Sequence, residues 1–241
     1  MATYVLVHGA GHGGWCWQRV ARLLRAAGHD VHTPTLTGLG DRAHLLSPEV
    51  GLDTHIADIA AMLTSEDLQD AILVGHSYGG IVITGAADRA LDRVGQLVFL
   101  DAAILESGES LAGTTPAIRA VRDDARTVGG VELVLWPDQP VARAIYGVTD
   151  ENDWAWMAER LRPHPWRCFA EPLLLANAEK VAHLPRTIIN CPSTLRLRTG
   201  EVLDRYFAAD RVWEIDTGHD TMITEPEKTA EMLLRLAGEG R

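Results

Sequence analysis

One short segment, residues 75–79 with the sequence Gly-His-Ser-Tyr-Gly, has the residue types and spacing of a nucleophilic serine. The aliphatic residues 71–74 precede it, and a run of small and aliphatic residues with helical character follows. Glycines allow a sharp turn from strand to helix, because a Cβ close to the turn would collide with the neighbouring backbone. Such a turn exposes the hydroxyl above a helix N-terminus, which favours developing negative charge. The pattern therefore predicts that Ser77 is a nucleophile.

A serine hydroxyl is a weak nucleophile and needs a general base, and the chain offers 10 histidines. In this arrangement the base follows the last strand of the sheet. His219 lies after the strand expected at residues 211–215 and before the helix expected at residues 225–237, so we assign it as the base. Turn packing explains the histidines inside glycine motifs. The rest are expected on surfaces or in loops, His55 and His164 among them.

The third member of such a triad is a carboxylate that orients the imidazole and stabilises its protonated form. Asp101 ends the strand expected at residues 96–100. A carboxylate at the end of a buried strand is costly unless it is paired, and His219 would be a suitable partner. Two alternatives stay open. Asp101 could instead cap a turn into the next segment, and Asp204 and Glu201 are then the fallback acids.

Attack on a carbonyl group creates an oxyanion that requires preorganised hydrogen-bond donors. One expected donor is the backbone N–H of Tyr78, which follows the nucleophile. The other belongs to the glycine-rich loop at residues 8–15, where we assign the N–H of Ala10, with Gly11 as the alternative. A phosphate-binding loop is disfavoured, because the loop lacks Gly-Lys-[Ser/Thr] and the Gly-x-Gly-x-x-Gly spacing.

Strand-like and helix-like segments alternate on both sides of these residues. The expected strands cover residues 3–7, 31–34, 71–74, 96–100, 186–190 and 211–215. This alternation predicts an α/β fold with a mostly parallel sheet and helices on both faces. In such folds ligands bind at the carboxyl ends of the strands. We therefore expect residues 1–101 and 183–241 to form the core that positions the site.

Between residues 102 and 182 the alternation stops, and tryptophans and prolines become frequent. We expect this segment to be an inserted, mostly helical cap over the sheet. Trp136 and Trp154, together with Gly11, are expected to wall an apolar substrate pocket. That the tryptophans form only the cap's own core is an alternative that stays open.

The composition limits the class of protein. With 241 residues the chain is long enough for one sizeable domain, and a formal charge of −11 disfavours nucleic acid or an anionic membrane as a partner. The three cysteines have neither zinc-site nor disulfide spacing, which favours a reducing compartment. No basic leader or long apolar run is present, so we expect a cytoplasmic protein. We expect no metal ion or cofactor, and a homodimer is left open.

Four motifs resemble those of a known group. The sequences VLVHGAGHGGWCW, GHSYGG, VFLDA and GHDTMITEPEK are similar to those of the α/β-hydrolase superfamily. The resemblance is to the branch that holds plant hydroxynitrile lyases, salicylate methylesterases and many bacterial relatives. It covers nearly the whole chain outside the expected cap. It implies a Ser-His-Asp enzyme that acts on small or medium esters beneath a helical cap, without a cofactor.

Two positions distinguish the lyases from the esterases within that branch. The lyases carry a threonine after the first loop histidine and a lysine after the catalytic histidine, whose positive charge supports the departing cyanide. This chain has Gly9 and Asp220 there. We expect the Asp220 carboxylate to repel cyanide and lyase activity to be absent.

The methylesterases usually place their aspartate after the later strand, where this chain has Thr194. This difference affects only the assignment of the triad acid, not that of Ser77 or His219.

The leading functional prediction is hydrolysis of a small-molecule carboxylic ester, methyl or aryl, through an acyl-enzyme at Ser77. A second hypothesis is cofactor-free chemistry on an aromatic or polyketide-like substrate, such as lactone opening, acyl transfer or oxygenation. Some cofactor-free dioxygenases of this fold also place the aspartate after the strand that follows the nucleophile helix. A third hypothesis, a non-catalytic receptor for a small ligand, is disfavoured by the complete set of triad residues.

Overall fold

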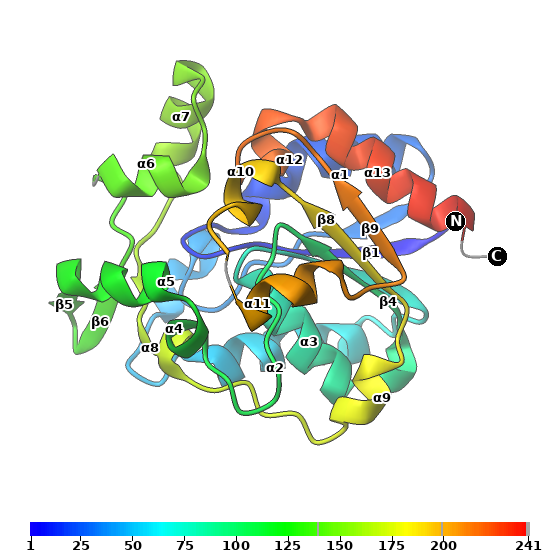
Figure 1. Ribbon diagram of the computed structural model, residues 1–241, viewed down its shortest axis with the longest axis horizontal. Coiled ribbons are helices and arrows are strands. Elements are labelled where there is room, and N and C mark those ends of the chain that lie inside the picture. The colour runs from blue at the N-terminus through cyan, green and yellow to red at the C-terminus, as the bar shows by residue number, and fades with distance from the viewer. Residues whose placement is uncertain (139, 199, 240–241) are drawn as a thin grey trace.

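A six-stranded parallel sheet forms the centre of the protein. The computed structural model describes residues 1–138, 140–198 and 200–239. The strands are β1 (Thr3–Val7), β2 (Asp30–His32), β3 (Ala71–His76), β4 (Val94–Leu100), β8 (Arg186–Asn190) and β9 (Arg211–Glu214). Their order across the sheet is β2-β1-β3-β4-β8-β9, and each of these neighbouring pairs is parallel. The predicted parallel α/β fold is confirmed (Figure 1).

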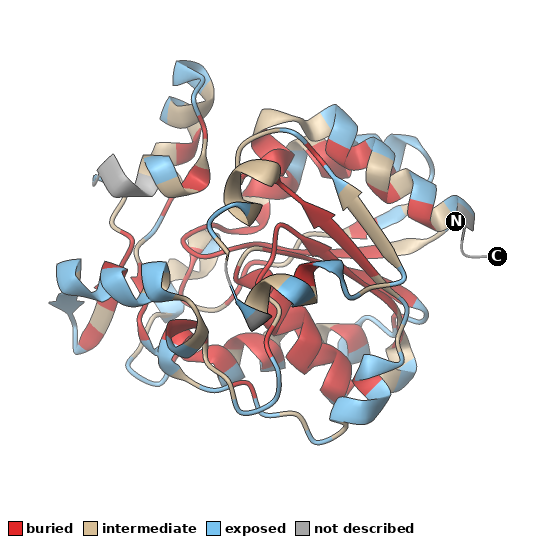
Figure 2. Cartoon of the chain, in the orientation of Figure 1, coloured by how far each residue is buried: buried red, intermediate tan, exposed pale blue. Residues whose placement is uncertain are grey.

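Helices cover both faces of this sheet. The longer ones are α1 (Gln18–Ala26), α2 (Leu52–Ser65), α3 (Gly79–Arg89) and α13 (Pro226–Glu239). Side chains alternate along β1, because successive residues of a strand point to opposite faces. Tyr4 and Leu6 pack in the cluster that includes α1 and α13, whereas Val5 and Val7 pack with α2 and α3. The central strands are buried on both faces, as Figure 2 shows.

Shorter helices join these elements. They are the 3-10 helices η1 (Gly14–Trp17), η2 (Gly40–Leu45), η3 (Leu91–Arg93) and η5 (Arg205–Phe207), and the short helices α10 (Pro192–Leu195), α11 (Glu201–Asp204) and α12 (Thr221–Thr224). Of these, α10 and α12 lie next to the candidate site, because they follow β8 and the loop after β9.

The segment between β4 and β8 is partly helical, as expected, but it also contains a small sheet. Its elements are α4 (Leu111–Thr114), α5 (Pro116–Ala120), η4 (Val121–Asp124), β5 (Arg126–Val128), β6 (Val131–Val134), α6 (Pro140–Tyr146), α7 (Glu151–Ala158), β7 (His164–Pro165), α8 (Arg167–Ala170) and α9 (Ala178–Ala182). Strands β5, β6 and β7 form an antiparallel sheet. Most of the segment lies to the left of the parallel sheet in Figure 1, whereas α9 packs against α3 of the core.

Candidate active site

Ser77 lies at a sharp turn between β3 and α3. Its φ of +53° is in the left-handed region, which is uncommon for a residue with a side chain and marks local backbone strain. The flanking glycines make the turn possible. A Cβ on Gly75 would lie 2.5 Å from the carbonyl oxygen of Gly79, and a Cβ on Gly79 would lie 2.7 Å from that of Val7. The local geometry is that of a nucleophile turn.

The loop after β1 packs directly against this turn. A Cβ on Gly9 would lie 2.8 Å from Ser77 Cβ and 2.9 Å from His76 Nδ1. The closeness of the two backbones brings Ala10, the next residue of the loop, to the side of the nucleophile. The structure therefore places the predicted oxyanion loop where it could act on a substrate bound at Ser77.

His219 and Asp101, far apart in the sequence, are in hydrogen-bond contact. The Nδ1 of His219 lies 2.5 Å from Oδ2 of Asp101. Asp101 ends β4 with a φ of +42° and is 1% exposed, and the side chain of His219 is 12% exposed. Burial of Asp101 opposes its ionisation, but the attraction and hydrogen bond of His219 outweigh this and lower its pKa to about 2. Burial would also lower the pKa of His219, but the Asp101 carboxylate raises it above the ordinary value.

Thr194 and Arg198 complete the surroundings of Asp101. Oγ1 of Thr194 lies 2.6 and 2.7 Å from the two carboxylate oxygens, close enough to donate its one proton to either. Nη2 of Arg198 lies 3.5 Å from Oδ1 of Asp101, and its guanidinium stacks on the ring of Tyr206. Thus the position where related methylesterases carry the acid supplies a hydrogen bond to an acid on the neighbouring strand.

Of the two fallback acids, the structure describes the side chain of Asp204 alone. Asp204 is exposed on α11, and the side chain of Glu201 lies outside the described part of the chain. Asp101 is thus the carboxylate that the structure brings to His219.

His76 connects the nucleophile turn to the loop that carries His219. Its Nε2 lies 3.0 Å from the carbonyl oxygen of His219 and donates to it, since a carbonyl only accepts. The two imidazole rings are 4.6 Å apart between centroids. The backbone of the predicted base is therefore bonded to the residue directly before Ser77.

The two predicted oxyanion donors differ from their neighbour Gly11. The N–H of Gly11 donates to Nδ1 of His164, at 3.2 Å. Within residues 1–138, 140–198 and 200–239, the N–H groups of Ala10 and Tyr78 donate to no other residue. Both amides are available to a substrate oxygen, and the geometry favours Ala10 over Gly11.

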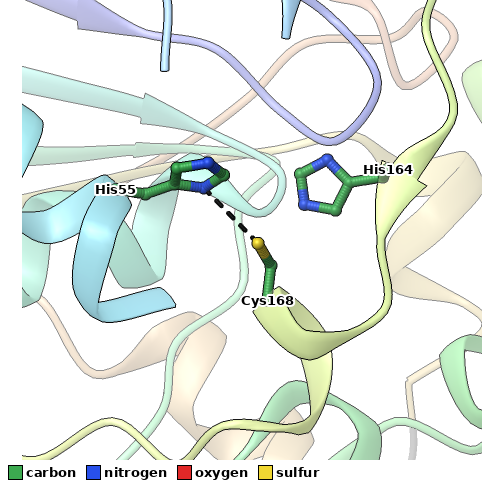
Figure 3. A group of neighbouring side chains, drawn as sticks. All are labelled: His55, His164 and Cys168. Atoms are coloured by element: carbon green, nitrogen blue, oxygen red, sulfur yellow. Dashed lines mark hydrogen bonds between the residues drawn. The ribbon is translucent and has the colours of Figure 1, made fainter. Parts of the chain in front are cut away.

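Three polar side chains, those of His55, His164 and Cys168, lie close together, as Figure 3 shows. His55 and His164 are both fully buried, so the expectation that they lie on surfaces or in loops is wrong. Nε2 of His55 lies 2.9 Å from the Thr37 carbonyl, so it carries the proton, and Nδ1 accepts from the Tyr78 hydroxyl at 2.9 Å. The two imidazoles are thus hydrogen-bonded to Tyr78 and to Gly11, respectively, which offsets part of the cost of their burial.

The same cluster has the residue types of a metal site, but its hydrogen bonds disfavour metal binding. Potential ligand atoms of His55, His164 and Cys168 lie within 4.8 Å of one another. Because Nδ1 of His164 accepts from Gly11, its proton is on Nε2, so neither ring nitrogen offers a free lone pair to a metal ion. Burial also raises the pKa of the Cys168 thiol, which keeps it protonated. We interpret the cluster as a support for the loop and for Tyr78.

A cleft of about 870 Å³ opens above His219. It is lined from one side by the segment between β4 and β8 and from the other by the loops after β8 and β9. The lining contains apolar side chains such as Ile118 and Ile145 together with the carboxylates Asp150, Asp153 and Glu225. Among the lining residues within the described ranges there is no Lys or Arg.

Three residues expected to wall the pocket are absent from this lining. Trp136 lies against the guanidinium of Arg126, at 4.4 Å, and Trp154 against that of Arg143, at 5.3 Å. Gly11 is held by hydrogen bonds to the segment that follows α7. None of the three residues expected to wall the pocket therefore lines this cleft.

Asp220 is turned away from the cleft. It is fully buried, and its Oδ2 lies 2.8 Å from Nε2 of His12. Its carboxylate pairs with His12 and does not line the cleft, so the repulsion of cyanide by this charge stays a prediction. The lysine of the lyases is nevertheless missing from this position.

Comparison with known proteins identifies the family of the chain. The model of the alpha/beta hydrolase family matches residues 4–232. A carbendazim hydrolyzing esterase from Nocardioides sp. is 38% identical, covering 98% of this chain and all of the relative, and methylesterase 7 of Arabidopsis thaliana is 28% identical over 97% and 95% of the two chains. The crystal structure of a methylesterase from Arabidopsis matches with a TM-score of 0.78 at 25% identity, over 99% of both chains. The chain belongs to the alpha/beta hydrolase family.

Proposed function

We propose that the protein is a serine esterase that hydrolyses small or medium carboxylic esters, methyl or aryl esters among them. The observation that carries this proposal is the 2.5 Å contact between His219 and Asp101, on a loop bonded to the residue before Ser77. The strained serine, the paired imidazole and two amides that donate to no described residue support this proposal, because acyl transfer requires a nucleophile, a base and oxyanion donors. The esterase names of the relatives support the same reaction class.

In the proposed reaction, Nε2 of His219 removes the proton of Ser77 as Oγ attacks the ester carbonyl carbon. Asp101 holds the imidazole by its Nδ1–H and stabilises the imidazolium that forms. The N–H groups of Ala10 and Tyr78 bind the oxyanion. The intermediate collapses as His219 returns the proton to the leaving alcohol, which leaves an acyl-enzyme. Water, deprotonated by His219, then attacks the acyl carbon and releases the acid and the free Ser77.

The surroundings of the site suggest the kind of substrate. The cleft suits a small or medium molecule, and we propose that residues 102–182 form the cap that encloses it. No helix within the described ranges is long and apolar enough to cross a membrane. We further propose that the enzyme acts in the cytoplasm on a free small-molecule ester.

The proposal is tested with p-nitrophenyl esters of short acids. Ser77→Ala should lower kcat by roughly 10⁴-fold or more with unchanged folding by circular dichroism, since the nucleophile is lost. Ser193→Ala is the matched control, because Ser193 lines the cleft and its hydroxyl donates to the Thr217 carbonyl, away from the candidate triad. It should retain activity within a few-fold. Mass spectrometry should locate an organophosphonate adduct on Ser77.

Three outcomes would contradict the proposal. Turnover that survives in Ser77→Ala would show that Ser77 is not the nucleophile. Oxygen consumption during turnover would favour the cofactor-free oxygenase, and ligand binding without turnover would favour the receptor.

A further inference from the structure

A second buried histidine–carboxylate pair lies behind the candidate triad. Asp220 directly follows His219, and its Oδ2 lies 2.8 Å from Nε2 of His12. Nδ1 of His12 lies 2.8 Å from the carbonyl oxygen of Ala10. Both side chains are buried, and neither lines the cleft. The pair therefore joins the loop of the base to the loop of the oxyanion donor.

Oxygen atoms face both ring nitrogens of His12. They are Oδ2 of Asp220 at Nε2 and the carbonyl oxygen of Ala10 at Nδ1. Burial of Asp220 opposes its ionisation, but the attraction of His12 outweighs this and lowers the pKa of the carboxyl group. The two side chains form a buried, hydrogen-bonded histidine–carboxylate pair. Such a buried pair adds little stability over apolar packing of the same volume.

The pair is also connected to the segment over the cleft. The N–H of Asp220 donates to the carbonyl of Tyr146, at 3.0 Å, and the ring of Tyr146 packs edge-on against His12 with centroids 5.0 Å apart. Oδ1 of Asp220 is buried without a hydrogen bond to a described residue and faces His76 Nε2 at 3.6 Å. The Asp220 carboxylate therefore lies at the junction of three loops that meet at the site.

We propose that Asp220 and His12 are positioning residues that hold the Ala10 amide and the His219 imidazole in register for oxyanion binding and proton transfer. This rests on the proposed serine esterase activity. His12 holds Ala10 through its carbonyl, while Asp220 holds the chain at His219. The negative charge of Asp220 also stabilises the imidazolium of His219 in the transition state, in addition to Asp101.

The charged and titratable groups around the two rings determine what a pH profile will report. His219 faces Asp101 from the end of β4, Arg198 from the loop after α10, and His76 and Asp220 at its back. His12 faces Asp220 and the rings of Trp15, Tyr146 and His76. Of these groups, Asp101 and Asp220 raise the pKa of His219, whereas Arg198 lowers it.

The test replaces Asp220 by its uncharged isostere. Asp220→Asn should lower kcat roughly 10- to 100-fold while KM changes little, because misplaced groups lose transition-state contacts. The acid limb of kcat/KM should also move to lower pH, since a negative charge near His219 is gone. Asp216→Asn is the matched control, because Asp216 is exposed on the same loop. It should change neither quantity.

His12→Gln provides the second variant, and the double variant tests coupling. If the two residues act together, the double variant should lose no more than the worse single variant. An Asp220→Asn enzyme that matches Asp216→Asn in kcat and in pH profile would overturn the proposal. So would variants that lose only thermal stability, or that fail to fold, since the pair would then be structural. Absence of ester turnover in the unaltered protein would instead contradict the proposed function.

Discussion

At the scale of single residues, the site depends on a carboxylate that directly follows β4, whereas the usual position is after β8. Asp101 ends β4, next to the nucleophile strand, whereas the resemblance to methylesterases suggested the end of β8. The cost of burying an unpaired carboxylate was enough to predict Asp101 from the sequence. The hydrogen bond from Thr194 could not be predicted, because it depends on how β4 and β8 end side by side. The same holds for His12 and Asp220, whose contact joins two distant loops.

Replacement of Asp101 tests the acid directly. Asp101→Asn should lower kcat by roughly 10³- to 10⁴-fold, because the amide leaves the imidazole without its negative partner. The acid limb of kcat/KM should also shift in a defined direction. Catalysis needs neutral His219, whose pKa is raised by Asp101, so kcat/KM falls as the pH drops through that raised value. Without the carboxylate the pKa of His219 falls, and the acid limb should move to lower pH.

The measurement is kcat/KM for a p-nitrophenyl ester from acidic to mildly alkaline pH, with Asp204→Asn as the matched control. Asp204 is exposed, so its variant should keep the original acid limb. If Asp101→Asn retained full activity while Asp204→Asn lost it, the acid would be Asp204.

At the scale of elements, local patterns predicted the strands well and the segment over the cleft poorly. Strands β1, β3, β4 and β8 are recognisable because both of their faces are buried, which requires continuous apolar runs. The β5–β6 hairpin was missed, although its signal was present. Gly129 and Gly130 have φ values of +57° and +81°, as a two-residue turn of type I′ requires. The roles of Trp136 and Trp154 could not be predicted, because arginine partners cover them.

The strand-to-helix turn offers a test at this scale. In Gly75→Ala the new Cβ would meet the Gly79 carbonyl oxygen at 2.5 Å, so the backbone must shift. We expect the free energy of unfolding to fall by about 1–3 kcal/mol, and kcat to fall with it because the turn carries Ser77.

Gly238→Ala is the matched control for this substitution. Gly238 lies in α13 with nothing within 4 Å of the added Cβ. Its variant should keep full activity and gain up to about 1 kcal/mol, because alanine favours the helix. Urea unfolding and ester turnover measure both quantities. Equal stability and activity for the two variants would show that the turn tolerates a side chain and carries no strain that matters.

At the scale of the whole molecule, charge should influence which esters react. The chain has a formal charge of −11, and the described lining of the cleft contains carboxylates without a Lys or Arg. Two of these carboxylates are partly neutralised, since Asp153 pairs with Arg19 at 2.6 Å and Glu225 with Lys228 at 3.1 Å. Asp150 instead accepts from the backbone at the start of α7. The cleft should therefore favour cationic over anionic esters and should help expel the carboxylate product.

Three acetyl or acyl esters of similar size separate charge from shape: a choline ester, its neutral 3,3-dimethylbutyl counterpart and an anionic half-ester. We expect KM to rise in that order by a few-fold at each step at low salt, and the differences to shrink at high ionic strength. Asp150→Asn should reduce the preference without harming α7, because asparagine caps a helix as well as aspartate does. Asp138→Asn, exposed and outside the lining, should leave it unchanged. An anionic ester that binds as well as its neutral counterpart at low salt would show that the paired cations cancel the carboxylates of the cleft.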